Sequence, residues 1–211
     1  MNYFKYLALS IVISIVFPAQ AGSFEDFFVY LSNDNAGGVI ELLNRGFDPN
    51  TKNEKGQPGL TLAMQERSLQ AARALLASPA TDVNALNAAG ESALMIAALK
   101  GDMDGATMLL ERGAQVNKTG WTPLHYAATG PEPRLVRLLI DRGAELNARS
   151  PNGTTPLMMA AQYGTEDSAN LLLERGADPK LRNDLKLGVV DFALKAGRNV
   201  LAAKLDALQQ R

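Results

Sequence analysis

The sequence predicts an all-α repeat protein, a solenoid of about five to six helix–turn–helix units, and two observations lead to this fold class. The glycines that open similar segments fall at positions 22, 56, 90, 120 and 153, with Lys186 in the sixth equivalent place. The spacings are therefore 34, 34, 30, 33 and 33 residues. Alanine pairs, leucine pairs and a closing Gly-Ala coincide column by column in the segments 90–117, 120–147 and 153–180. A near-constant period of this length is typical of stacked supersecondary units.

A secretory signal is expected before the repeats. Lys5 is followed by an apolar run from Leu7 to Phe17, and Ala19-Gln20-Ala21 supplies the small residues of a cleavage site. The run is shorter than the roughly 20 residues of a membrane span. We therefore expect a signal peptide over 1–21, cleaved after Ala21, and a mature chain in the periplasm or outside the cell without membrane insertion. An uncleaved N-terminal anchor is the alternative.

The composition is that of an ordinary globular chain. Of the 211 residues, 46% are hydrophobic and 20% are charged, and the formal net charge is −1. A chain so close to neutrality has no general electrostatic attraction for nucleic acid. The absence of cysteine excludes disulfides, thiolate metal sites and cysteine nucleophiles.

Helix starts and ends recur with the same period. Thr122 and Thr155 can cap helices that have Pro123 and Pro156 at their first position, where no N–H is needed. Ser23 with Asp26 predicts an N-cap pair that opens a first helix. Apolar residues follow helical spacing in that first helix: Phe24, Phe27, Phe28 and Leu31. Glycines suit the helix ends: Gly101, Gly164 and Gly197 after first helices, and Gly113, Gly143 and Gly176 after second helices.

Two segments carry a family resemblance. The residues Gly120, Thr122-Pro123-Leu124-His125, Ala127-Ala128 and Gly143-Ala144 recur as Gly153, Thr155-Pro156-Leu157, Ala160-Ala161 and Gly176-Ala177. This pattern resembles the ankyrin repeat. The resemblance implies two antiparallel helices and a projecting β-hairpin or loop, called a finger below, in each unit.

The resemblance covers essentially the whole chain after residue 21. The expected units are 22–55, 56–89, 90–119, 120–152 and 153–185, followed by a C-terminal capping repeat at 186–211. They are called repeats 1 to 6 below. The segment 56–84 departs from the pattern, with Pro58-Gly59 in place of Thr-Pro, and is a candidate weak point. The finger between Asn117 and Gly120 is three residues shorter than its neighbours, which predicts a notch directly before Trp121.

His125 is the single histidine of the chain, and we interpret it as part of the scaffold. Its column holds Thr61, Met95, Met158 and Asp191 in other repeats. In the family that this chain resembles, the imidazole bonds to backbone that links adjacent repeats. A general base would need a nucleophile or substrate group to serve, and a metal ligand would need companions at close spacing. We therefore expect no catalytic residue, no metal site and no cofactor.

The resemblance implies that a partner protein binds to the first-helix face and the finger tips. The first candidate site is an aromatic and methionine cluster beside the shortened finger: Trp121, Tyr126, Met159 and Tyr163. Trp, Tyr and Met anchor many interfaces because they bring a large area with few lost rotamers. The alternative is that these side chains fill space between adjacent helices.

The second candidate site lies on the fingers. The windows 50–56, 84–90, 117–120, 147–153 and 180–186, called fingers 1 to 5 below, carry seven basic and two acidic residues, a net charge of +5. Lys118, Arg149 and Arg182 are the expected electrostatic guides. Such asymmetry steers an acidic partner and speeds its encounter. An ordinary solvated finger surface is the alternative.

The function that we expect is a non-enzymatic protein-binding scaffold in the bacterial periplasm, monomeric and without nucleic-acid partners. It supports or protects an envelope enzyme, or as an alternative it is an immunity protein that neutralises a toxin acting in the periplasm. A self-associating structural protein is a further alternative, and an enzyme that depends on His125 is the competing class.

Overall fold

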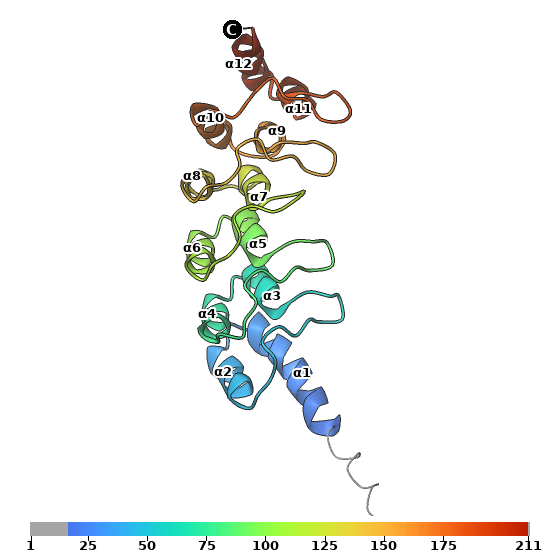
Figure 1. Ribbon diagram of the computed structural model, residues 1–211, viewed down its shortest axis with the longest axis vertical. Helices are drawn as coiled ribbons and strands as arrows, with labels where there is room; N and C mark the ends of the chain where they lie inside the picture. The colour runs from blue at the N-terminus through green and yellow to red at the C-terminus, as the bar shows by residue number, and fades with distance from the viewer. Residues whose placement is uncertain (1–16, 211) are drawn as a thin grey trace, which may run out of the picture.

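The helices of the chain form two parallel columns, as Figure 1 shows. The computed structural model describes the backbone of residues 17–210 and the side chains from Gly22 onward. The inner column contains α1 (Phe17–Ser32), α3 (Gly59–Glu66), α5 (Ala93–Lys100), α7 (Pro123–Thr129), α9 (Pro156–Gln162) and α11 (Val189–Lys195). The outer column contains α2 (Ala36–Asn44), α4 (Leu69–Ala77), α6 (Met103–Glu111), α8 (Pro133–Asp141), α10 (Glu166–Glu174) and α12 (Asn199–Gln209). The predicted all-α repeat solenoid is confirmed.

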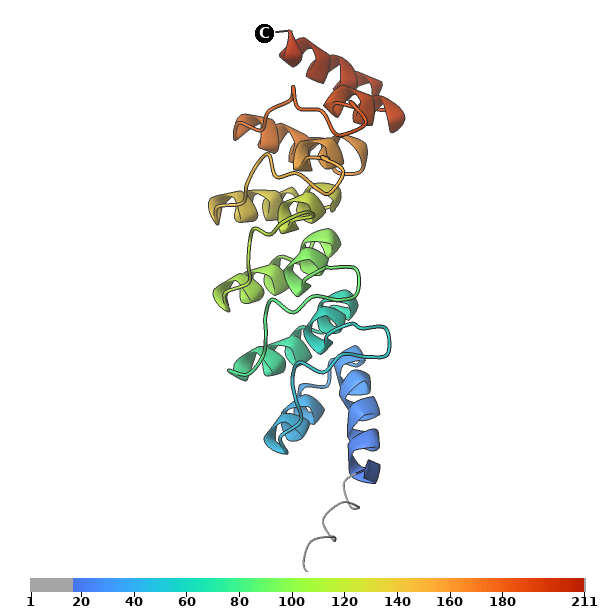
Figure 2. The same cartoon turned by 45° about the vertical axis from the view of Figure 1, so that its right-hand side comes forward.

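The fingers project from the inner column, away from the outer helices (Figure 1). Fingers 1, 2 and 5 are each closed by a single antiparallel bridge: Lys52 with Pro58, Leu86 with Ser92, and Arg182 with Gly188. Figure 2 turns the molecule by 45° and shows the same stacking of helix pairs along its long axis. Fingers and inner helices therefore lie on one side of the solenoid, where a partner can touch several repeats at once.

The backbone confirms the period on which the prediction rests. The glycines at 56, 90, 120 and 153 have φ values of +71°, +77°, +83° and +76°. Lys186, in the equivalent place of repeat 6, also has a positive φ, +63°. Glycine adopts this conformation without steric cost, because it has no Cβ to collide with the following carbonyl.

Two helix ends differ from the sequence-based expectation. α1 begins at Phe17, so Ser23 lies inside the helix and is not its N-cap. The segment before Ser23 continues the helix because Ala19, Gln20 and Ala21 favour it, and Pro18 stands in the first turn, where proline is tolerated. The predicted signal peptide lies mostly outside the described residues, which begin at Phe17. Gly164 is needed for a different reason from the one expected: a Cβ there would collide with the carbonyl oxygen of Ala128.

The core runs the length of the solenoid between the two columns. Leucines from both columns, such as Leu94, Leu109, Leu124 and Leu139, are fully or almost fully buried. Alanine pairs on the inner helices let neighbouring repeats approach closely, and both members of the pair at Ala127 and Ala128 are 0% exposed. None of the helices in the described part of the chain is long and apolar enough to cross a membrane.

Candidate functional site

His125 joins repeat 4 to repeat 5. Its Nε2 lies 3.0 Å from the carbonyl oxygen of Thr154, and its Nδ1 lies 3.2 Å from the backbone nitrogen of Thr122. The hydroxyl of Thr122 also lies 2.9 Å from Nδ1. Because a backbone N–H can only donate, Nδ1 accepts, and Nε2 carries the proton that it donates to Thr154. The expected bond from this imidazole to the backbone of an adjacent repeat is confirmed.

The environment of His125 keeps it neutral. Burial lowers the pKa of the imidazole from 6.5 to about 4, against the opposing effect of its hydrogen bonds to the backbone of Thr154 and Ala148. The side chain is 0% exposed. Thr122 is the N-cap of α7, as the sequence pattern predicts, and its hydroxyl also contacts the imidazole. His125 is thus a connector between repeats.

The predicted aromatic cluster lies along the inner column. The rings of Trp121 and His125 meet edge to face, with centroids 5.2 Å apart, so Trp121 covers the histidine. Tyr126 donates a hydrogen bond of 2.7 Å to Oε1 of Glu91, on the preceding repeat. Burial and the bond to Glu91 raise the pKa of Tyr126. The sequence had not marked Glu91 as a partner, because the two residues are 35 positions apart.

The members of this cluster differ in how much surface they offer. Tyr163 is 59% exposed, whereas Tyr126 and Met159 are partly buried and pack against the core. Trp121 is also partly buried. Trp121, Tyr126 and Met159 thus pack against their neighbours and keep part of their surface exposed. Their role in binding stays a prediction.

The three predicted cationic guides are held by their surroundings. Lys118 Nζ folds back onto its own short finger, 3.1 Å from the carbonyl oxygen of Thr119 and 3.3 Å from that of Trp121. Arg149 donates to the carbonyl oxygen of Arg182 and lies 3.6 Å from Asp184. Arg182 donates to the carbonyl oxygen of Lys186 and lies 3.7 Å from an oxygen of Asp191. Carboxylates thus offset part of the charge on fingers 4 and 5.

An asparagine ladder fixes the bases of the fingers. The amide of Asn117 donates to the carbonyl oxygen of Gly143 at 2.8 Å and accepts from the backbone nitrogen of Glu145 at 2.9 Å. Asn50, Asn84 and Asn147 also form side-chain hydrogen bonds with the backbone of the next repeat. Asparagine at the end of each unit is visible in the sequence, but its partner in the next repeat is not. These hydrogen bonds tie the base of each of these fingers to the next repeat.

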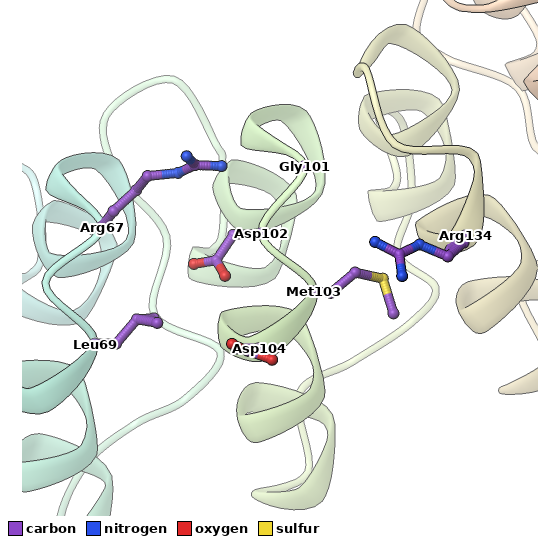
Figure 3. Close-up of a pocket in the computed structure, with 7 residues that line it drawn as sticks. All are labelled: Arg67, Leu69, Gly101, Asp102, Met103, Asp104 and Arg134. Carbon is purple, nitrogen blue, oxygen red and sulfur yellow. The ribbon is translucent and has the colours of Figure 1, made fainter.

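One pocket lies at the opposite end of the inner helices, beside the turns that lead to the outer column. Its volume is about 430 Å³, and its charged lining residues are Arg67, Asp102, Asp104 and Arg134 (Figure 3). Three of them make structural contacts. Asp102 caps α6 through the backbone nitrogen of Gly105, while Arg67 donates to the carbonyl oxygen of Lys100. Arg134 pairs with Glu132 on its own helix start. We assign no chemistry to this pocket.

Comparison with known proteins identifies the family. The family model for ankyrin repeats (3 copies) matches residues 28–119 and 116–183. The mouse B-cell lymphoma 3 protein homolog is 32% identical over 149 residues, which are 67% of this chain and 33% of that protein. Protein glp-1 of Caenorhabditis elegans is 30% identical over 168 residues, which are 72% of this chain and 12% of that protein.

A third relative shows the same pattern. Human neurogenic locus notch homolog protein 1 is 36% identical over 124 residues, 57% of this chain and 5% of that protein. The chain therefore spans a third or less of the length of these relatives. What the matches share is a repeat architecture that serves as a scaffold for protein–protein interaction. With its regular fingers, paired helices and matched repeats, the chain belongs to the ankyrin repeat family.

Proposed function

We propose that this protein is a non-enzymatic binding scaffold of the bacterial periplasm that holds one partner protein against its inner helices and fingers. The observation that carries the proposal is the row of partly exposed side chains beside the shortened finger 3, on the inner column of an ankyrin solenoid. Trp121, Tyr126 and Tyr163 offer aromatic surface there. Large aromatic side chains held in place by their neighbours bind with little loss of conformational entropy.

The charge of the fingers supports an acidic partner. Seven basic residues against two acidic ones leave the five fingers with a net charge of +5 on a chain of net charge −1. Complementary potentials accelerate encounter and select against basic proteins. The association rate should therefore fall as salt is raised, because exposed charges are screened beyond about 10 Å at 0.1 M salt.

The periplasmic location rests on the signal-like segment 1–21. N-terminal sequencing of the protein from an envelope fraction tests it, with Gly22 as the expected first residue. A chain recovered from the cytoplasm with Met1 or Asn2 at its start contradicts this part of the proposal. In the periplasm, we propose that the scaffold supports or protects an envelope enzyme.

The binding test is a pull-down from envelope extract with the chain 22–211. The double variant Trp121→Ala, Tyr126→Ala is compared with wild type, and circular dichroism verifies that both are folded. Val200→Ala is the matched control, because Val200 is 84% exposed on α12, away from the inner column. We expect one protein that wild type and control retain and the double variant loses. A protein retained equally by all three removes this cluster from the proposal, and an empty eluate contradicts the binding function.

A further inference from the structure

We propose that the tip of finger 5, formed by Leu185 and Lys186, is a preformed docking element that inserts into an apolar pocket bordered by acidic residues on the partner protein. This inference rests on the proposed binding function and goes beyond it, because it assigns the anchor and the complementary chemistry of the partner. Finger 5 is the loop that projects before α11 in Figure 1.

Leu185 is a highly exposed leucine at a position where the other fingers carry no large apolar residue. Its side chain is 73% exposed, more than those of the exposed leucines Leu86, Leu99 and Leu194. Equivalent tip positions in fingers 1 to 4 carry Lys55, Ala89, Thr119 and Asn152. A single exposed leucine is common on protein surfaces, so its exposure alone decides nothing. The backbone that presents it carries the argument further.

Lys186 holds a backbone conformation that L-residues disfavour. Its φ is +63°, and the four equivalent positions in the other fingers are all glycine. A lysine there adds steric strain between its Cβ and the backbone, which glycine would relieve. Residues kept in such conformations cluster at active sites and ligand clamps, where their function outweighs the cost in folding stability. The Lys186 ammonium forms no ion pair among the described residues, which leaves it open to a partner.

Finger 5 is rigid because several bonds converge on it. Oδ1 of Asn183 accepts from the backbone nitrogens of Leu185 and Leu187, each at 3.0 Å. Arg182 donates to the carbonyl oxygen of Lys186 at 2.8 Å. Finger 4 adds a backbone bond of 3.1 Å from Asp184 to Asn152. A loop already fixed in this way loses little entropy when it binds, so its affinity per contact is high.

The charges around the tip define the occupant. Lys180 and Lys186 lie on either side of Leu185 in the sequence of finger 5. Arg182 and Arg149 add positive charge that Asp191 and Asp184 partly offset. Asp184 is the single acidic residue within finger 5. An exposed leucine bordered by basic residues complements an apolar pocket bordered by Asp and Glu. A membrane suits it less, because one leucine brings too little apolar area for stable anchoring.

The experiment measures the affinity of the protein recovered in the pull-down for purified variants of the chain 22–211. Leu185→Ala should weaken binding roughly tenfold, as loss of an interface anchor does. Lys186→Gly should weaken binding roughly threefold and lower its salt dependence, because one charge is removed. The same variant should raise the midpoint of thermal unfolding, since glycine relieves the strain. The matched control Val200→Ala should change neither quantity.

Lys186→Gly should weaken binding and raise the midpoint of thermal unfolding. These opposite effects separate a docking role from a structural one. Affinities of Leu185→Ala and Lys186→Gly within twofold of wild type overturn the docking element. If the same partner is then lost with Trp121→Ala, Tyr126→Ala, the proposed function stands without it, and an empty eluate removes both. Co-sedimentation of wild type with phosphatidylglycerol vesicles, lost in Leu185→Ala, would reassign the tip to a lipid surface and overturn the protein partner.

Discussion

His125 and Thr61 occupy the same column in repeats 4 and 2, and both side chains are 0% exposed, but their surroundings differ. The imidazole of His125 contacts the backbone of two repeats. The hydroxyl of Thr61 is buried without a hydrogen-bond partner. The repeat pattern therefore fixes how deeply this position is buried, and the residue that occupies it decides how strongly adjacent repeats are joined.

A second pair of positions in these repeats extends the comparison. Gly164, after the inner helix of repeat 5, allows close contact with the carbonyl oxygen of Ala128 in repeat 4. The equivalent position in repeat 2 is Arg67, which has a positive φ of +58° without being glycine. Repeat 2 thus combines an unpaired buried hydroxyl with a strained backbone. In a solenoid whose stability is shared between neighbours, we expect repeat 2 to open before repeats 4 and 5.

Replacement of His125 by alanine tests the junction between repeats 4 and 5 and should have the largest effect on stability. The change leaves a cavity and strips the buried Thr122 N–H and Thr154 carbonyl of their partner, so unfolding should be easier by about 4 kcal/mol. Urea denaturation measures the loss. Thr61→Ala, at the same position of repeat 2, should change stability by less than about 1 kcal/mol, because it removes a methyl group and an unpaired hydroxyl together. Equal losses in the two variants would break the comparison.

Acid should weaken the same junction between repeats 4 and 5. Burial holds the pKa of His125 at about 4 in the folded chain, below the 6.5 of an unfolded histidine. The unfolded chain therefore binds more protons between these pH values, so this stability is complete above pH 6.5 and is lost as pH falls towards 4. The loss amounts to about 3 kcal/mol. Urea titrations at several pH values measure it, and a wild-type slope that persists in His125→Ala would assign the effect to carboxylates instead.

Gly164→Ala should cost about 2 kcal/mol, because its Cβ would collide with a backbone oxygen that cannot move without shifting α7. Gly143→Ala is the control: it has open space around its Cβ but a φ of +84°, so it reports backbone strain alone. We expect about 1 kcal/mol for that control. Thermal unfolding of both variants separates collision from strain, and a larger loss at Gly143 would contradict the packing account.

Local chemistry explains what the sequence could predict. Thr155 with Pro156 and the glycine period specify helix starts and backbone turns within a few residues, so the solenoid followed from spacing. The connecting role of His125 followed from the resemblance to the ankyrin repeat. The directions of Lys118 and Arg149 did not follow, because they depend on carbonyls and carboxylates of other loops. The strain at Lys186 also needed the structure, since the sequence shows only that a glycine is missing there.

Thr61→Val tests the weak side of the comparison and should have the smallest effect, with the opposite sign. Valine keeps the branched shape of threonine and removes the unpaired buried hydroxyl. Burial of that hydroxyl costs desolvation free energy that no hydrogen bond offsets. We expect repeat 2 to become more stable by about 1 kcal/mol. Amide hydrogen exchange locates the change: protection should rise in α3 and α4 and stay constant in α9 and α10. A uniform rise along the solenoid would mean that repeat 2 unfolds together with the rest, and that the chain has no separate weak unit.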